Sequence, residues 1–472
     1  YRLSNIPYVI IRKMIKLFNT LTRKKEPFKA INNNKAGIYT CGPTVYWYAH
    51  LGNLRTYLFE DILRRTLEYN GYKIKQVMNI TDVEDKIIKK ALAENKDIYE
   101  ITKPYTKIFF DDLKKLNIEK VEKYPKATEH IKEMINMIKS LIKKKLAYKG
   151  EDRSIYFSIS KFKNYGKLSQ LEKRELKIGA RISSDEYKKE EAQDFVLWKT
   201  QSDKKLKKIK AVWNSPWGWG RPGWHIECSA MSMKYLGKTF DIHAGAVDLI
   251  FPHHENEIAQ SKGTTGKKFS NFWLHGEHLL VDGQKMSKSL GNFFTLRDIE
   301  NKNINFLAFR YLVLTSHYRS KLNFTWESLQ AAQSALNNLI NDLRQITNYR
   351  RLTTDDKKIQ KYKKEFLNAI NDDFNTPKAI ALIWRIIKDD NLSDSIKKQL
   401  ILEFDKVLGL GLNKIKPIKI QKIPLKIKKM AEERGILRRN KQFIPADLLR
   451  KKIKELGYII EDTEKEPKIT KK

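Results

Sequence analysis

Four side chains of types that commonly bind metal ions stand far apart in this sequence. Cys41 and Cys228 are its two cysteines. His253 and Glu257 are four residues apart, so in a helix they lie on one face. Two thiolates, an imidazole and a carboxylate form a suitable donor set for zinc. The residues alone also allow a plainer interpretation, because isolated cysteines are often buried apolar side chains and a His–Glu pair often lies on a helix face.

Two short stretches have the composition of phosphate-binding loops. Residues 50–53, His-Leu-Gly-Asn, stand where a strand is predicted to turn into a helix, whose N-terminus offers unpaired N–H groups and a partial positive charge. Residues 285–289, Lys-Met-Ser-Lys-Ser, carry two lysines three residues apart, which suits a triphosphate and the charge of its transition state. Taken singly, each stretch also fits an ordinary turn or a basic surface loop.

Together these stretches resemble the two nucleotide-binding motifs of class I aminoacyl-tRNA synthetases. The fourth residue of the first motif is usually histidine and is Asn53 here, which can donate a hydrogen bond but carries no charge. The segments around the cysteines, residues 39–46 and 220–231, and residues 251–257 resemble motifs of the cysteinyl-tRNA synthetase family. Three further segments match that family in the same order: residues 79–82, 194–199 and 372–377. The similarity therefore extends over nearly the whole chain.

The resemblance implies an ATP-dependent ligase that activates L-cysteine to cysteinyl-adenylate and transfers it to the 3′-terminal adenosine of tRNA(Cys). It also implies one Zn²⁺ per chain, bound by Cys41, Cys228, His253 and Glu257, and Mg²⁺ with the ATP. Zinc prefers a thiolate to a hydroxyl, so the metal would select cysteine over serine without an editing site.

The resemblance also implies roles for individual side chains. The catalytic residues, expected to stabilise the developing phosphate charge, are His50, Asn53, Lys285 and Lys288. Those expected to contact ATP are His50, Gly52, Asn53, Lys285, Ser287 and Lys288. Those expected to line the cysteine pocket are Thr44, Thr81, Trp224, His243 and Asp248. Among these, Asp248 suits the α-ammonium group, whereas Trp224 and His243 would enclose the side chain.

An α/β fold is needed to bring these segments together. Residues 37–43 have the pattern of a strand that ends in a turn. A helical pattern follows Asn53 and stops at Asn70-Gly71, and residues 74–80 have the pattern of the next strand. A strand, a helix and a strand in this order are the building block of a parallel sheet.

The rest of the chain divides by composition. Residues from about 300 to 410 have a helical pattern throughout, and residues 414–429 carry seven lysines, no acid and two prolines, which indicates a linker. The predicted fold is α/β, with a Rossmann-like parallel-sheet catalytic domain that contains an insertion, then an α-helical bundle and a small C-terminal domain. The predicted boundaries are a non-native or disordered leader at 1–13, the catalytic domain at 14–100 and 211–300, a connective insertion at 101–210, a stem-contact and helical-bundle tRNA-binding region at 301–412, and a basic linker with an anticodon-binding domain at 413–472. The leader is basic, so a targeting segment is the alternative interpretation.

The composition favours a polyanionic partner. The formal net charge is +38, although a chain rich in Lys, Ile and Asn can also gather charge on solvated faces. Hydrophobic residues make up 41% of the 472 residues, which excludes wholesale disorder, and no apolar run is long enough to span a membrane. Two cysteines exclude a disulfide-rich secreted domain, so we expect a cytoplasmic protein and, from the family, a monomer.

Two other functions fit parts of this pattern. A ligase that joins cysteine to a small amino-sugar acceptor would share the zinc and ATP motifs but would not need the long basic C-terminal region. A non-catalytic RNA-binding paralogue would keep the basic helices and lose ligands or lysines, yet all four metal positions and both motif lysines are present. A tRNA-charging assay distinguishes these functions. The amino-sugar ligase would form the adenylate but not charge tRNA, and the RNA-binding paralogue would bind tRNA without any reaction.

Overall fold

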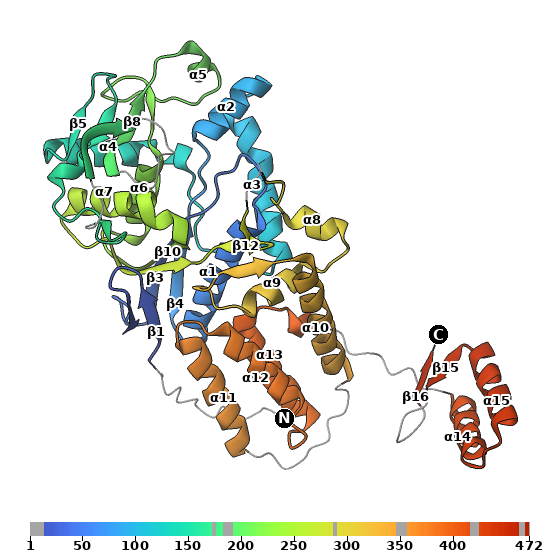
Figure 1. Ribbon diagram of the computed structural model, residues 1–472. Coiled ribbons are helices and arrows are strands. Elements are labelled where there is room, and N and C mark those ends of the chain that lie inside the picture. Colours follow the sequence, from blue (N-terminus) through green and yellow to red (C-terminus); the bar gives the residue numbers. More distant parts are fainter. Residues whose placement is uncertain are drawn as a thin grey trace, which may run out of the picture. The chain divides into compact units, whose positions relative to one another are not determined.

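The computed structural model describes residues 14–171, 176–182, 192–286, 290–345, 356–415, 424–461 and 468–471. Its contacts divide the chain into two compact units, residues 1–415 and residues 416–472, which we describe separately (Figure 1). The predicted leader, residues 1–13, lies outside the described residues. Among the helices of the described part, none is both long and apolar enough to cross a lipid bilayer.

A four-stranded parallel sheet in the order β11-β10-β3-β4 lies at the centre of the first unit. β3 (Lys35–Thr40) continues through α1 (Leu51–Tyr69) to β4 (Lys73–Met78). β10 (Phe240–Ala246) continues through α7 (Glu255–Thr265) to β11 (Ser270–Gly276) on the other side. The strand order therefore reverses between β3 and β10, and ligands of open α/β sheets bind outside the carboxyl ends of the strands at such a point. The predicted Rossmann-like sheet is confirmed.

α1 lies between the sheet and the helical region (Figure 1). All of its charged side chains except Glu68 are buried. Asp61 forms ion pairs with Arg65 at 2.7 Å and with Arg310 of α9 (Phe306–Leu314) at 2.6 Å. Burial opposes ionisation of Asp61, but the two guanidinium groups lower its pKa. Buried charges persist when they are paired in this way, and the pairs join α1 to the helical region.

A second layer of structure is inserted between β4 and β10. Its five-stranded sheet has the order β5-β6-β8-β7, with β9 on β8. Phe157 and Trp198 of this sheet share a hydrophobic core with Ile226 of α6, whereas Leu113 of α3 packs in the main core with α1. The elements are α2 (Asp85–Glu94), α3 (Ile98–Lys115), α4 (Ile131–Lys143), β5 (Ala147–Lys149), β6 (Ile155–Phe157), β7 (Leu176–Ile182), β8 (Ala192–Thr200), α5 (Lys204–Lys208), β9 (Gly220–Pro222) and α6 (Trp224–Leu236).

The segment after β11 is mainly helical. α11, α12 and α13 pack against one another, and α13 also packs on α1 (Figure 1). The prediction of helix throughout this region was wrong at Leu322–Phe324, which form strand β14 and pair in parallel with β12. Alternate burial of three residues is too short a pattern to find in a sequence, and the pairing partner is distant. The elements are β12 (Leu279–Val281), β13 (Gln284–Lys285), α8 (Leu296–Asn301), α10 (Trp326–Gln345), α11 (Asp356–Asn371), α12 (Thr376–Ile387) and α13 (Asp394–Leu408); the first unit begins with the hairpin β1 (Lys16–Asn19) and β2 (Lys24–Pro27).

The second unit is a small helical domain with a two-stranded sheet. It consists of α14 (Leu425–Arg439), α15 (Phe443–Glu455), β15 (Tyr458–Glu461) and β16 (Lys468–Lys471). Its core is formed by Ile427, Ala431, Ile453 and Ile460. The predicted linker was therefore too long, because its last residues belong to α14, which begins directly after Pro424. Proline is well suited to a helix start because its fixed φ and missing N–H cost nothing there.

Candidate active site and metal centre

A cleft with a volume of about 470 Å³ opens at the carboxyl ends of β3, β10 and β11. It is lined by residues 41–50 after β3, by Ala246, Asp248 and Leu249 at and after the end of β10, and by residues 276–279 at and after the end of β11. The structure therefore brings segments more than 200 residues apart into one cavity. Eight predicted site residues lie on its wall: Cys41, Thr44, His50, Gly52, Asn53, Trp224, Asp248 and Lys285.

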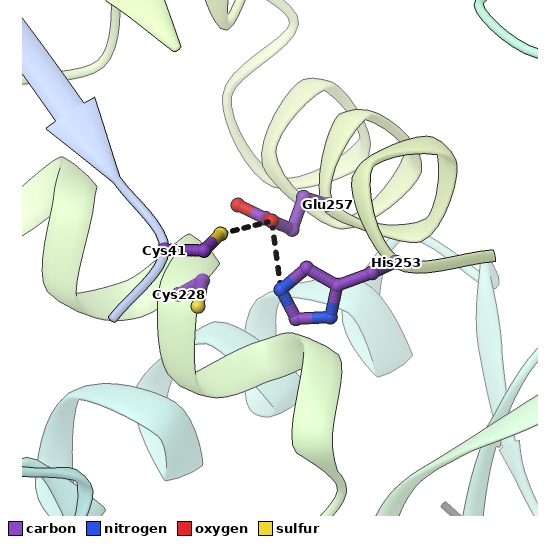
Figure 2. Close-up of side chains that lie close together, drawn as sticks. All are labelled: Cys41, Cys228, His253 and Glu257. Atoms are coloured by element: carbon purple, nitrogen blue, oxygen red, sulfur yellow. Dashed lines mark hydrogen bonds and ion pairs between the residues drawn. The ribbon is translucent and has the colours of Figure 1, made fainter. Parts of the chain in front are cut away.

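The four predicted metal ligands lie close together (Figure 2), and one of them, Cys41, also lines the cleft. The donor atoms of Cys41, Cys228, His253 and Glu257 are within 4.8 Å of one another, and all four side chains are buried. Cys41 follows β3, Cys228 lies on α6, and Glu257 lies in the first turn of α7. Nε2 of His253 is 3.0 Å from Oε1 of Glu257, in agreement with their predicted position on one face.

A second set of donors overlaps the first. Cys41 and Glu257 also lie within 4.8 Å of ring nitrogens of His243 and His254. Nε2 of His243 is 2.9 Å from Oε2 of Glu257, and Nε2 of His254 is 3.3 Å from Sγ of Cys41. We favour the set that contains Cys228, because it offers two thiolates and zinc binds soft thiolate ligands well.

The charges in this cluster suit a bound cation. Burial opposes ionisation of Cys228, but a hydrogen bond with Cys41 and the charge of His253 lower the pKa of Cys228 to about 6. Burial also opposes protonation of His253, but the Cys228 thiolate and the Glu257 carboxylate raise the pKa of His253 to about 10. A thiolate and a carboxylate thus face a protonated imidazole inside the protein. A divalent cation would replace that proton and satisfy both anions, so the donor set fits zinc.

The path of the loop that carries Cys41 depends on its neighbour Gly42. The Gly42 N–H donates to Oδ1 of Asn79 at 2.9 Å, and a Cβ at residue 42 would overlap the Asn79 carbonyl oxygen. Glycine is therefore required for this close approach between the ends of β3 and β4. The Asn79 amide donates to the hydroxyl of Thr81 at 3.1 Å, and that hydroxyl donates to Glu227 at 3.1 Å. Thr81 is thus buried, with Glu227 as its partner, and is not among the residues that line the cleft.

His50 and Asn53 form the N-terminal cap of α1. The Asn53 N–H donates to Nδ1 of His50 at 3.2 Å, and the His50 N–H donates to Oδ1 of Asn53 at 3.3 Å. Because Nδ1 accepts, the ring proton of neutral His50 is on Nε2, and the side-chain nitrogen of Asn53 can only donate. Both groups therefore suit a phosphate oxygen at the positive end of the helix dipole.

The other predicted residues differ in their exposure. The Trp224 ring lies 4.4 Å from the ring of His253, between the metal-ligand cluster and the cleft. Asp248 is exposed on the cleft wall. His243 is fully buried and stacks on Trp273 at 4.5 Å, so it does not line the cleft.

The second nucleotide-binding stretch begins at the end of a short hairpin. Lys285 is the last residue of β13 and is exposed at the cleft. The stretch continues through Ser287 and Lys288, which lie outside the described residues.

Arg55 is a cleft-forming residue that the sequence analysis missed. Its guanidinium group is buried and donates to the carbonyl oxygens of Glu277 at 2.8 Å and His278 at 2.5 Å. Both carbonyls belong to the segment of cleft wall that leads into the hairpin carrying Lys285. One feature of the sequence could have predicted this role: Arg55 is a charged residue close after His50 on an otherwise apolar helix face.

Comparisons with known proteins agree with this geometry. Residues 27–334 match the family described as tRNA synthetases class I (C) catalytic domain, and residues 365–413 match the DALR domain. A cysteine–tRNA ligase of Protochlamydia amoebophila (strain UWE25) is 46% identical over 479 residues, covering 98% of this chain and 98% of the relative. The chain belongs to the cysteine–tRNA ligase family. Cysteine–tRNA ligases of Chlamydia felis and Brachyspira hyodysenteriae are each 47% identical over 96% of this chain, covering 97% and 98% of the relatives.

Solved structures show that the family fold is shared more widely among synthetases. A methionyl-tRNA synthetase of Mycobacterium tuberculosis in complex with methionyl-adenylate superposes with a TM-score of 0.57 at 13% identity, covering 80% of this chain and 90% of that chain. A LeuRS–tRNA–LeuAMS complex of Agrobacterium radiobacter gives a TM-score of 0.56 at 11% identity, covering 80% and 83%. At these identities the likeness concerns the fold alone.

Loading of the metal-free protein with Co²⁺ should distinguish the two donor sets of this cysteine–tRNA ligase family member. If Cys228 is a ligand, Cys228→Ser should lose about half of the thiolate-to-cobalt absorbance, because one of two thiolates is removed. The ultraviolet–visible spectrum of the cobalt-loaded protein measures this. Cys41→Ser is the reference, since Cys41 belongs to both sets. An unchanged band in Cys228→Ser would assign the metal to His243 and His254 instead.

Proposed function

We propose that this chain activates L-cysteine with ATP and transfers the cysteinyl group to the 3′-terminal adenosine of tRNA(Cys). One observation carries the proposal: a single cleft holds the capped start of α1, Lys285 and Cys41 of the buried donor cluster. A nucleotide, a thiol-bearing amino acid and the metal-ligand cluster would thus meet in one place. Membership of the cysteine–tRNA ligase family supports the same activity.

In the first step, a carboxylate oxygen of cysteine attacks the α-phosphorus of ATP, and pyrophosphate leaves. His50 and Asn53 would donate to the phosphate oxygens from the start of α1, where Gly52 keeps the backbone accessible. Lys285 and Lys288 would stabilise the charge that grows on the pyrophosphate, with Ser287 as a further contact and Mg²⁺ on the ATP phosphates. These contacts require no side-chain nucleophile.

The amino acid would be selected by the metal-ligand cluster. Cys41, Cys228, His253 and Glu257 would hold zinc, which supplies, when bound, a soft Lewis acid for the substrate thiolate. A serine hydroxyl stays protonated and binds zinc poorly. Serine would therefore not supply the ligand that the cysteine thiolate supplies, and it would be rejected.

The chain's own residues would orient the rest of the substrate. Asp248 on the cleft wall would pair with the α-ammonium group, and Trp224 and Thr44 would enclose the amino acid. Thr81 and His243 do not line the cleft. They would position the site indirectly, Thr81 through its hydrogen bond to Glu227 and His243 through its hydrogen bond to Glu257. Binding in this way brings the carboxylate to the α-phosphorus, which is mainly a proximity effect.

In the second step, a hydroxyl of the terminal ribose of the tRNA attacks the adenylate carbonyl, and AMP leaves. The helices from α9 to α13, part of which match the DALR domain, and the basic second unit would bind the rest of the tRNA, with the small C-terminal domain at the anticodon. Residues 414–472 contain 19 basic and 8 acidic residues. Six basic side chains expected to contact phosphates are exposed: Arg438, Arg439, Lys441, Arg450, Lys451 and Lys452.

ATP–pyrophosphate exchange and tRNA charging test this proposal together. With zinc-loaded protein, exchange should require cysteine and should not occur with serine, and tRNA(Cys) should become charged. Exchange without charging would favour the ligase that joins cysteine to an amino sugar. Binding of tRNA without exchange would favour the RNA-binding paralogue.

The affinity for tRNA should depend strongly on salt. If about five phosphates are neutralised, log K should fall against log salt concentration with a slope of roughly −3.5 to −4.5. Filter binding or fluorescence anisotropy with tRNA(Cys) over a salt series measures this slope. A slope near zero would contradict phosphate recognition by the basic C-terminal residues.

A further inference from the structure

Part of the cleft wall is formed by aromatic side chains that the proposed contacts to ATP, cysteine and metal do not use. Trp47, Tyr48 and Tyr105 all line the cleft, and we call them the aromatic cluster. The ring centre of Trp47 is 5.4 Å from that of Tyr48 and 5.9 Å from that of Tyr105, and Tyr48 lies 5.6 Å from Tyr105. Trp47 and Tyr48 belong to the loop between Cys41 and His50, whereas Tyr105 lies on α3.

Two cations accompany the aromatic cluster. Nζ of Lys90 is 4.8 Å from the ring centre of Trp47 and 4.3 Å from that of Tyr105, and it donates to the Tyr105 hydroxyl at 2.7 Å. The guanidinium of Arg297 lies 4.5 Å from the ring centre of Tyr48 and is held by buried Asp112 at 2.8 Å. Aromatic rings interleaved with Lys and Arg are typical of surfaces that bind single-stranded nucleic acid, because bases stack on the rings and phosphates pair with the cations.

Packing of the loop does not account for the whole cluster. Tyr48 and Tyr105 are half-buried and hold the loop against α3, but 41% of Trp47 is exposed. Lys90 lies over the Trp47 ring, and the exposed part of the indole offers apolar surface to whatever enters the cleft.

We propose that Trp47, supported by Tyr48 and Tyr105, stacks on an unpaired nucleotide at the 3′ end of the tRNA. The inference rests on the proposed function, which requires the 3′-terminal adenosine to enter this cleft and reach the adenylate. The 3′ end of a tRNA is single-stranded, and single strands are recognised by stacking on aromatic side chains. Lys90, which also contacts Glu94, and Arg297, which is paired with Asp112, add positive charge next to the same strand.

The adenine of ATP is the other nucleobase that enters the cleft. We assign the cluster to the tRNA end because its two cations, on α2 and α8, are distinct from His50 and Lys285, the groups expected to contact the ATP phosphates. Separate assays of adenylate formation and of transfer to tRNA distinguish stacking on the adenine of ATP from stacking on the tRNA end.

Replacement of Trp47 tests the proposal. In Trp47→Ala, kcat/KM for tRNA(Cys) in cysteinylation should fall about 5- to 150-fold, whereas ATP–pyrophosphate exchange with cysteine should keep its KM for ATP. Trp47→Phe should recover most of the loss, because it keeps an aromatic face. Trp219→Ala is the matched control: Trp219 is 40% exposed and has Lys207 at 4.2 Å from its ring, but it lies outside the cleft.

Binding measurements sharpen the test. Trp47→Ala should weaken the binding of intact tRNA(Cys) and leave unchanged the binding of a tRNA that lacks its unpaired 3′ nucleotides. An equal effect on both tRNAs, or no difference between Trp47→Ala and Trp219→Ala, would overturn the proposal. A raised KM for ATP would assign the stacking to the adenine of ATP and overturn it as well. Failure of the wild-type protein to charge tRNA would instead contradict the proposed function itself.

Discussion

Cysteine-dependent ATP–pyrophosphate exchange should fall at least about 10³-fold in Cys228→Ala, together with the loss of bound zinc. The substitution removes one of two thiolates from a cluster whose donor atoms lie within 4.8 Å of one another. The remaining donors would hold the metal weakly, and the substrate thiol would lose the partner that distinguishes it from a hydroxyl. Exchange assays and metal analysis on the same purified protein measure both effects, and removal of zinc from the wild-type protein with a chelator should reproduce the loss.

Ser229→Ala is a suitable control for this variant. Ser229 is the next residue on α6, is fully buried, and donates to Oε1 of Gln260 at 2.6 Å. Its replacement should cost about 1 kcal/mol of stability, as for a typical buried hydrogen bond, and should leave zinc content and exchange intact. If Cys228→Ala lost zinc but still activated cysteine in preference to serine, the metal would be structural and the selection mechanism proposed above would be wrong.

His50→Asn should lower kcat for exchange about 10²-fold while the melting temperature stays near that of the wild type. Asparagine is among the best N-cap residues, so it should keep the cap that His50 makes with the Asn53 N–H. It shortens the side chain and so withdraws the ring N–H that we expect to donate to phosphate in the transition state. Steady-state exchange kinetics and thermal unfolding of the same preparation test the two halves of this prediction.

Two further variants separate capping from catalysis. His50→Ala should show the same catalytic loss and also lose about 1 kcal/mol of stability, because the cap is removed. Ser393→Asn changes the N-cap of α13, away from the cleft, and should leave exchange unchanged. Full activity of His50→Asn would show that the histidine acts only as a helix cap.

Local patterns were sufficient to predict the elements that position the site. The segment from β3 through α1 to β4 was predicted because strand and helix periodicities, and the stop at Asn70-Gly71, depend on residues close in sequence. The pairing of His253 with Glu257 followed from helix spacing for the same reason. The zinc donor set and the two phosphate-binding stretches were raised by residue type and spacing, but only the resemblance to a family favoured them over plainer interpretations, because no local pattern joins Cys41 to Cys228.

The tertiary structure alone revealed which groups meet across the fold. Three features join segments that are distant in the sequence. They are the second donor set with His243 and His254, the hydrogen bonds from Arg55 to the carbonyls of the cleft wall, and the aromatic cluster. Strand β14 was missed for the same reason, since its partner β12 lies about 40 residues away. Such contacts are determined by the packing of whole elements, in which buried polar groups must find partners and apolar faces must be covered, and no spacing within a single segment encodes that outcome.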